Sequence, residues 1–250
     1  MLKDVCTFID GVFADFRTDD YSNNGLQLEA GAECSRVAFA VDACLETIEK
    51  AADAGAQLLV VHHGLSWGSG FRRISGLDAR RFGLLFKRGL SLYACHLPLD
   101  AHPRLGNNAV IAAKLALKPT GSFFQCKGLD AGLVCELPAP IALGEILSRS
   151  LGAISTRSTV YDNSRGYAHS IGIVSGGGDS AILDCEHVGV DCLLTGEFSH
   201  QHYHEARELG VSVITCGHYD TENTGIKALM DEVASKMGMD CVFIDAPTGL

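Results

Sequence analysis

The fold is decided by the stretch Gly55-Ala-Gln-Leu-Leu-Val-Val-His62-His63-Gly64, in which an apolar run leads directly into two histidines. Residues 45–54 before it have apolar side chains at helical spacing, and Gly55 is a typical helix stop. The run 57–61 is short and apolar, which indicates a strand buried on both faces, as in parallel sheets. A helix that ends in such a strand predicts an α/β protein.

A second stretch repeats this pattern in the other half of the chain. Aligning Gly55 with Gly189 places the polar pair Gly196-Glu197 where the first half has His62-His63. In the same way, Leu92-Tyr-Ala-Cys95-His96 resembles Val213-Ile-Thr-Cys216-Gly217-His218. The repeat predicts two similar α/β lobes, and ligands bind at the carboxyl ends of strands in open α/β sheets.

The other expected elements follow from periodicity and from turn residues. Pro138 and Pro140 should start a helix near Ile141, and Asp179 should cap the helix that Gly189 ends. We expect a first lobe over 1–120 and a second over 121–250, with the last helix and strand packing on the first lobe. The expected helices are 1–16, 45–54, 78–88, 108–117, 201–208 and 221–237, and the expected strands are 36–41, 57–61, 90–95, 170–174, 192–194 and 211–215.

Composition excludes several classes of protein. With 47% hydrophobic and 20% charged residues over 250 positions, the chain is an ordinary globular protein and not a disordered one. The formal charge of -10 opposes broad binding to nucleic acid or to an anionic membrane. No targeting segment and no membrane span is recognised, so we expect a cytoplasmic protein.

The ten cysteines do not form a metal-binding or redox motif. No C-x-x-C pair occurs, which excludes the usual zinc-ribbon and thioredoxin-like spacings. Most of the cysteines, such as Cys95, Cys192 and Cys216, lie within apolar runs, where a reduced cysteine acts as a small hydrophobic residue.

Three segments place imidazoles or carboxylates directly after strands. They are His62-His63, the segment from His96 to Asp100, and the segment from His218 to Glu222. Mixed nitrogen and oxygen ligands suit zinc, manganese, iron, cobalt or nickel. Taken singly, each histidine is better explained by a hydrogen bond at a strand end, and Glu222 by the helix dipole. Because all three segments have the same residue types at the same position in the fold, we favour a metal site.

Other polar clusters have more than one explanation. Arg72, Arg73, Arg80 and Arg81 either bind an anionic substrate or form a solvated helix edge. Trp67 either stacks on a substrate base or fills an oligomer contact. His200, His202 and His204 either form a second metal site or lie on a solvated or partly buried face, and we favour the face. The glycine run 176–178 either holds a phosphate or forms a flexible turn, and we favour the turn.

The motifs together resemble the NIF-three-like dinuclear-metal-centre proteins over essentially the whole chain. The matching segments, in order, are Tyr21–Gln27, Val60–Gly64, His96–Asp100, Gly106–Asn108, Leu194–Glu197 and Gly217–Glu222. The resemblance implies that His62, His63, Asp100, His218 and Glu222 bind two divalent metal ions, with His96 close by. It also implies two lobes with mixed sheets that face each other across this site, a homohexamer built as a trimer of dimers, and no inserted domain.

Two departures from the family pattern affect the substrate more than the metals. Gln201 stands where many relatives have a histidine, and Asp220 and Asn223 differ from the usual residues around the last ligand segment. All five ligand positions are intact.

The resemblance implies a hydrolase of the GTP cyclohydrolase 1 type 2 homolog group, in which metal-activated hydroxide attacks a nucleotide or another small anionic molecule. Glu197, Asp220 and His96 are then candidate catalytic proton shuttles, and Arg72, Arg73 and Trp67 are candidate substrate-binding residues. The alternative is a non-enzymatic metal-binding hexamer that serves as a scaffold, regulator or metal carrier. A ring that processes DNA would need a positive lumen, which the net charge does not suggest.

Overall fold

The computed structural model describes residues 1–250, which form two compact units. Unit 1 consists of Met1–Leu99 and Ile226–Ala246, and unit 2 of Asp100–Gly225 and Pro247–Leu250. Two helices contain points where the chain passes between units: α4 (Leu97–Ala101) and α9 (His218–Met237). Candidate metal ligands occur in both units, with His62, His63 and His96 in unit 1 and Asp100, His218 and Glu222 in unit 2.

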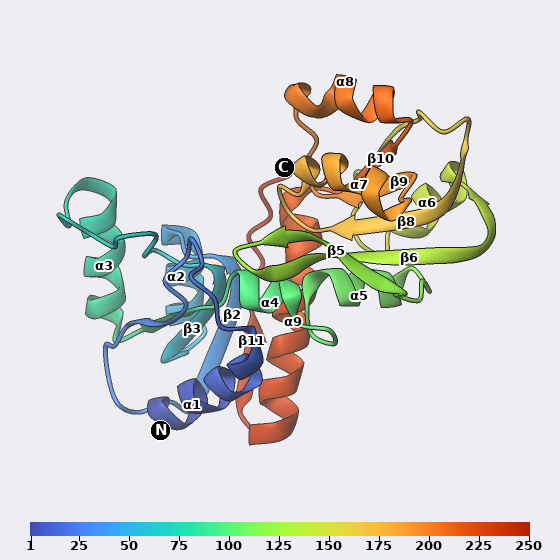
Figure 1. The fold of residues 1–250 in the computed structure, drawn as a ribbon. Coiled ribbons are helices and arrows are strands. Elements are labelled where there is room, and N and C mark those ends of the chain that lie inside the picture. The colour runs from blue at the N-terminus through green and yellow to red at the C-terminus, as the bar shows by residue number, and fades with distance from the viewer. The chain divides into compact units, whose positions relative to one another are not determined.

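Unit 1 is built on a five-stranded mixed sheet in the order β1-β4-β3-β2-β11. Figure 1 labels β3, β2 and β11 of this sheet. Strands β11, β2, β3 and β4 are parallel, and β1 pairs with β4 in the antiparallel sense. The strands are β1 (Gly25–Leu28), β2 (Arg36–Asp42), β3 (Leu58–His63), β4 (Ser91–Ala94) and β11 (Asp240–Phe243). Because β2, β3 and β4 run in the same direction, their carboxyl ends bring Asp42, His63 and Cys95 to one edge.

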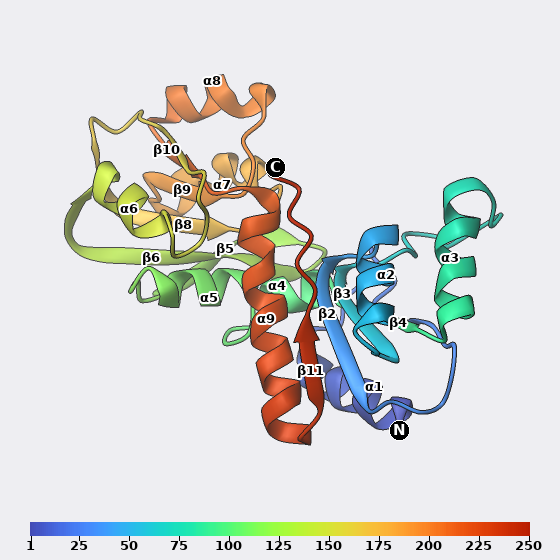
Figure 2. The same cartoon turned by 180° about the vertical axis from the view of Figure 1, so that it is seen from behind.

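Alternate residues of these strands cover opposite faces of the unit 1 sheet. Ala38, Leu59 and Leu92 pack with helices α2 (Leu45–Asp53) and α3 (Gly76–Arg88) on one face. On the other face lies α1 (Leu2–Val12), where the Tyr93 hydroxyl donates to Asp10 at 2.6 Å. Figure 2 shows the unit 1 part of α9 running beside β11. A sheet buried on both faces explains why its strands are continuously apolar.

Unit 2 has a six-stranded mixed sheet in the order β5-β6-β8-β9-β10-β7. Its strands are β5 (Gly121–Cys126), β6 (Leu129–Ala142), β7 (Thr159–Tyr161), β8 (Tyr167–Val174), β9 (Cys192–Thr195) and β10 (Ser212–Thr215). The central three, β8, β9 and β10, are parallel. Their carboxyl ends lead into the segments that begin at Ser175, Gly196 and Cys216.

Helices cover both faces of the unit 2 sheet. Cys192 and Leu194 point to a core shared with α5 (Asn107–Lys114) and α6 (Leu143–Ser150). Leu193, between them in the chain, packs in a second core with α7 (Ile182–Val188) and α8 (His200–Leu209). Successive residues of β9 therefore contact two separate helical layers, as the period of two in a strand requires. The predicted α/β class with mixed sheets is confirmed.

Three local predictions were wrong. Pro138 and Pro140 lie inside β6, in the stretch where its pairing with β8 shifts register, and the helix begins only at Leu143. Proline is tolerated there because the shifted stretch needs no ladder hydrogen bond. Asp179 caps no helix, since its carboxylate accepts the Ser199 amide instead.

The third error concerns the last helix, which begins at His218 rather than at Thr221. The extra turn places His218 and Glu222 four residues apart on one helix, which makes them neighbours. The prediction that most of the cysteines are core residues is confirmed: all ten are free, and seven of them are buried. No helix is both long and apolar enough to cross a bilayer.

Candidate metal-binding residues

Three imidazoles cluster at the carboxyl edge of the unit 1 sheet. His62, His63 and His96 each offer one ring nitrogen, and these nitrogens lie within 4.8 Å of one another. The ring centroids of His62 and His63 are 4.6 Å apart, and those of His62 and His96 are 5.1 Å apart. His62 is fully buried, whereas His63 and His96 are partly exposed. Three clustered nitrogen donors of this kind are typical ligands for a divalent transition metal.

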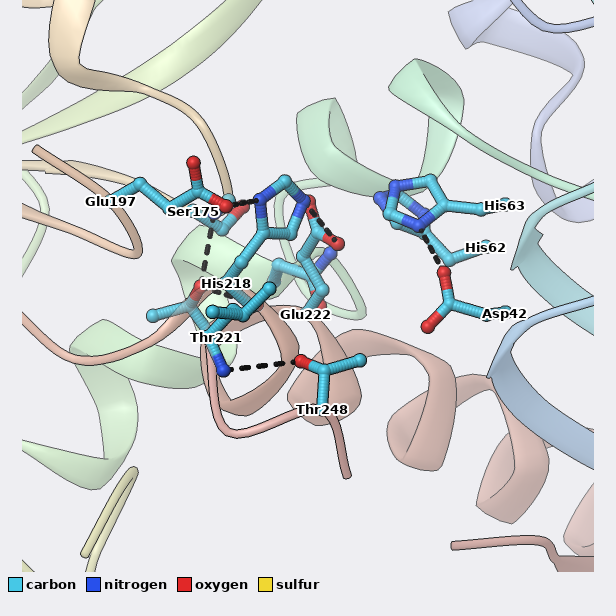
Figure 3. A network of polar contacts seen from close by, with 12 residues as sticks. Asp42, His62, His63, Ser175, Glu197, His218, Thr221, Glu222 and Thr248 are labelled. Carbon is cyan, nitrogen blue, oxygen red and sulfur yellow. Dashed lines mark hydrogen bonds and ion pairs between the residues drawn. The ribbon is translucent and has the colours of Figure 1, made fainter. Parts of the chain in front are cut away.

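Adjacent residues of a strand normally point to opposite faces, yet His62 and His63 share this cluster. Strand β3 continues through His63, so the explanation is not that the strand has already ended. The two rings are instead held toward different neighbouring strands. His62 Nδ1 bonds the carbonyl of Cys95 after β4 at 2.9 Å. His63 Nδ1 bonds Asp42 at the end of β2 at 2.8 Å (Figure 3).

His96 is held by a buried carboxylate. Its Nδ1 lies 2.9 Å from Asp20 Oδ1, and the side chain of Asp20 is 0% exposed. Burial alone would raise the pKa of Asp20, but the hydrogen bond and charge of His96, with help from Asn24, lower it. Asn24 also accepts the backbone amide of His96 at 2.7 Å. Asn24, in the turn formed by Asn23-Asn24-Gly25, therefore helps to orient His96.

The loop after β3 is fixed by Gln27. Its Oε1 accepts the backbone amides of Leu65 and Ser66 at 2.8 and 3.0 Å. A Cβ atom on Gly64 would lie 2.3 Å from that same oxygen, so a larger residue at this position would displace the Gln27 amide. This loop presents Trp67, whose indole donates to the carbonyl of Gly64 and meets the ring of His96 edge-on at 5.2 Å.

The predicted anion-binding arginines lie further along this loop. Arg72 and Arg73 are both exposed, so their charge is accessible to a ligand. Trp67 is 39% exposed and lies beside both His96 and His63, which places one predicted substrate-binding residue next to the imidazole cluster.

Unit 2 contributes an imidazole between two carboxylates. His218 Nε2 lies 3.1 Å from Glu222 Oε2, and His218 Nδ1 lies 2.6 Å from Glu197 Oε1 (Figure 3). Burial opposes the charged form of His218, but hydrogen bonds and charge from Glu222 and Glu197 outweigh it and raise its pKa to about 9. A positive charge is therefore favoured at this position in the metal-free protein.

The glycine loop after β8 passes directly over this pair. A Cβ atom on Gly176 would lie 2.1 Å from Glu222 Oε1 and 3.1 Å from His218 Nε2. The backbone is fixed in place, because the amide of Gly176 donates to Thr221 and its carbonyl accepts the amides of Gly196 and Glu197. The glycine run is thus a close backbone approach to polar side chains, rather than the flexible turn we expected.

The remaining predicted site residues of unit 2 have defined partners. Asp100 Oδ1 accepts from Asn107 at 2.7 Å and from Ser175 at 3.2 Å. The carboxylate of Asp220 accepts the hydroxyl of Ser155 at 2.6 Å. Glu197 contacts the ring nitrogen of His218 that faces away from Glu222.

All four histidines have the same chemical arrangement. In each of them Nδ1 is bonded to an oxygen, so a metal would bind at Nε2, which in His218 lies 3.1 Å from Glu222 Oε2. The acceptors are the Cys95 carbonyl for His62, Asp42 for His63, Asp20 for His96 and Glu197 for His218. The donor set therefore fits divalent ions that take nitrogen and oxygen ligands.

Sequence reasoning missed Asp20 and Asp42. Asp42 had a usable signal, since it follows the apolar run 36–41 just as the histidines follow theirs. Asp20 lies ahead of the Asn-Gly turn in an irregular segment, and nothing in its spacing connects it with His96, 76 residues away.

This is the arrangement of an α/β protein whose strand ends present clustered side chains that could hold a metal ion. Comparisons with known proteins identify its family. A family model described as Duf34/NIF3 (NGG1p interacting factor 3) matches residues 1–248. The chain therefore belongs to the Duf34/NIF3 family.

Relatives and solved structures match over almost the whole chain. A protein of Archaeoglobus fulgidus and one of Pyrococcus abyssi, both named GTP cyclohydrolase 1 type 2 homolog, are each 41% identical to it, with 99% or more of each chain covered. The solved structure of the protein ybgI, described as of unknown function, has a TM-score of 0.91 at 31% identity and 99% coverage of both chains. The structure of TTHA1606 from Thermus thermophilus has a TM-score of 0.87 at 37% identity, with the same coverage.

Proposed function

We propose that this protein is a divalent-metal-dependent hydrolase that acts on a nucleotide or another small anionic molecule. The observation that carries the proposal is the cluster of three imidazoles in unit 1, whose ring nitrogens lie within 4.8 Å of one another and whose Nδ1 atoms are each bonded to an oxygen. The names of the curated relatives, GTP cyclohydrolase 1 type 2 homologs, support the same class of reaction.

The proposal includes two metal ions bound by ligands from both units. The family resemblance names His62 and His63 from unit 1 and Asp100, His218 and Glu222 from unit 2. The charge balance supports it, since two carboxylates, Glu197 and Glu222, flank one imidazole in unit 2. Divalent ions bound to these residues would supply Lewis acidity and lower the pKa of water.

The chain's own residues have three tasks in this proposal. Asp42, Asp20 and Glu197 orient the imidazoles. Arg72 and Arg73 attract an anionic substrate, and the exposed face of Trp67 offers a surface on which a base can stack. For proton transfer we propose Glu197 and His96 ahead of Asp220, whose carboxylate is engaged by Ser155.

A second candidate is a metal-binding protein without turnover, such as a scaffold, regulator or metal carrier. The complete burial of His62 within the sheet favours it, because a metal bound there would stabilise the folded chain whether or not a substrate is converted. In either case we propose a homohexamer, as the resemblance implies.

The experiment that tests the hydrolase is turnover by metal-loaded protein. GTP and a model phosphodiester serve as substrates, and His63→Ala should reduce kcat by at least about 100-fold. His169→Ala is the matched control, because His169 also bonds a carboxylate, Asp191, through Nδ1 but is exposed and outside the cluster. Metal binding without turnover of either substrate would favour the second candidate.

A further inference from the structure

His96 is not among the five ligands that the family resemblance implies, yet its environment is that of a ligand. One of its ring nitrogens belongs to the group of three that lie within 4.8 Å of one another in unit 1. Its ring centroid is 5.1 Å from that of His62 and 5.6 Å from that of His63. Its backbone amide and its Nδ1 are both engaged, so the ring has a fixed direction.

The residue that fixes this direction is Asp20. Each of its oxygens accepts two hydrogen bonds. Oδ1 accepts from His96 Nδ1 and the Ser22 amide, and Oδ2 accepts from the Leu97 amide and Asn24. With about four acceptor sites in use, the carboxylate has none left for a metal. Asp20 can therefore act on the cluster only through His96.

Burial distinguishes Asp20 from the comparable carboxylates. The side chain of Asp20 is 0% exposed, whereas that of Asp42 on His63 is 38% exposed and that of Glu197 on His218 is 51% exposed. A buried charge is screened less by water, and four hydrogen bonds prevent the group from rotating away. Asp20 is thus the most rigidly held of the three carboxylates that orient an imidazole.

We propose that Asp20 is a positioning residue that holds His96 as a third metal ligand of unit 1, beside His62 and His63. The inference rests on the proposed metal binding. The carboxylate accepts Nδ1–H, which fixes the tautomer with an unprotonated Nε2 and increases the basicity of that nitrogen. Three imidazoles give unit 1 a nitrogen-rich metal site. A His96 that binds the metal would not also act as the proton shuttle.

The alternative is that Asp20 only holds the surrounding backbone in place and does not act through His96. Through Ser22, Asn24 and Leu97 the carboxylate also ties the segment 20–24 to the residues after β4. Loss of these bonds could weaken metal binding by loosening the loop. The test therefore needs a readout at the His96 ring itself and a background in which that ring is absent.

The test uses Asp20→Asn, with Asp19→Asn as the matched control. Asp19 is the adjacent carboxylate, whereas the bonds to His96 and Asn24 are made by Asp20. Nitrogen NMR of the full-length metal-free protein at pH ~8, above the ordinary imidazole pKa of about 6.5, distinguishes the Nδ1–H and Nε2–H tautomers of neutral histidines. We expect His96 to carry its proton on Nδ1 in the native protein and in Asp19→Asn, and to shift toward the Nε2–H form in Asp20→Asn.

Metal affinity supplies the second readout. In competition with a chromophoric chelator, Asp20→Asn should bind Zn²⁺ about 10- to 100-fold more weakly, as is usual when a carboxylate behind a ligand histidine is lost. His96→Gln should weaken binding at least as much. In the His96→Gln background, Asp20→Asn should cause no further loss, because Asp20 acts through the imidazole.

Two results would overturn the inference. The first is an unchanged His96 tautomer and unchanged Zn²⁺ affinity in Asp20→Asn. The second is an additional, independent loss of affinity in the His96→Gln background, which would show that Asp20 acts on the loop. If the native protein itself binds no Zn²⁺, the proposed function fails as a whole, and that result is seen before any variant is compared.

Discussion

The four candidate ligand histidines differ in the acceptor that holds Nδ1, and the difference has chemical consequences. His62 bonds a neutral carbonyl, while His63, His96 and His218 bond carboxylates. A carboxylate stabilises the protonated imidazole and makes the opposite nitrogen a stronger metal ligand, whereas a carbonyl only fixes the tautomer. His62 is fully buried, and its carbonyl partner adds no charge at this position.

We predict that His218 makes the stability of the metal-free protein depend on pH. Its pKa in the folded chain is about 9, above the ordinary value of 6.5. The folded state therefore binds the proton more tightly than the unfolded state. The resulting stabilisation, about 1 to 3 kcal/mol, is fully present below pH ~6.5 and is lost as the pH rises through about 9.

The measurement is urea unfolding of chelator-treated protein between pH ~6 and ~10, compared with His218→Gln. The difference in free energy of unfolding between the two proteins should shrink across this range. Glu197→Gln removes the carboxylate at Nδ1 and should lower the pKa of His218, so that the stabilisation is lost at a lower pH than in the native protein. A difference that stays constant with pH would show that the two glutamates do not hold a proton on His218.

Buried thiols lead to a second prediction at this scale. Burial raises the pKa of Cys135 to about 11 and that of Cys185 to about 12. Because the thiolate is the reactive form, iodoacetamide at pH ~8 should leave both residues unmodified in the folded protein. The partly exposed Cys44 and Cys126 serve as internal comparators in the same digest by mass spectrometry. Rapid alkylation of Cys185 in the native state would contradict the assignment.

At the scale of elements, the most specific prediction concerns the loop after β8. Gly176 has a φ of +63° and lies where a side chain would meet Glu222 and His218. We predict that Gly176→Ala lowers Zn²⁺ affinity at least about 10-fold, because the added methyl displaces the Glu222 carboxylate.

Gly189→Ala is the matched control for this variant. Gly189 ends α7 with a φ of +69°, but its missing Cβ faces open space. Both variants should lose about 1 kcal/mol of folding free energy from the left-handed backbone. Only Gly176→Ala should lose metal, as measured by chelator competition. An equal loss in both variants would assign the effect to backbone strain alone.

The elements that the sequence predicted well are those with strong periodicity. Apolar strands such as β3 and β9, each preceded by a helix and a glycine, were located because burial on both faces requires an unbroken apolar run. The start of α9 was missed by three residues, since Gly217 and His218 look like loop residues until the helix is seen to include His218. Predictions of irregular segments failed for a related reason: Asp20 gains its role from a partner distant in sequence.

At the scale of the whole molecule, each unit has its own sheet and its own hydrophobic cores. Such units could unfold independently, and the continuous helix α9, which has residues in both, is one covalent element that links them. A metal bound only by the folded chain adds stability that grows with its concentration. If ligands of both units bind the same ions, metal binding stabilises both units together, and losing the ligands of either unit removes this stabilisation.

We therefore predict that a ligand variant in either unit removes most of the stabilisation by metal. Saturating Zn²⁺ at about 100 times its dissociation constant should stabilise the native protein by about 2.7 kcal/mol, seen as a rise in Tm. His63→Ala in unit 1 and His218→Ala in unit 2 should each abolish most of this rise, while His169→Ala should keep it. The contrary result is that each ligand variant loses only its own part of the rise in Tm and that the two losses add. Each unit would then bind its own metal, and the proposal of a shared dinuclear centre would be wrong.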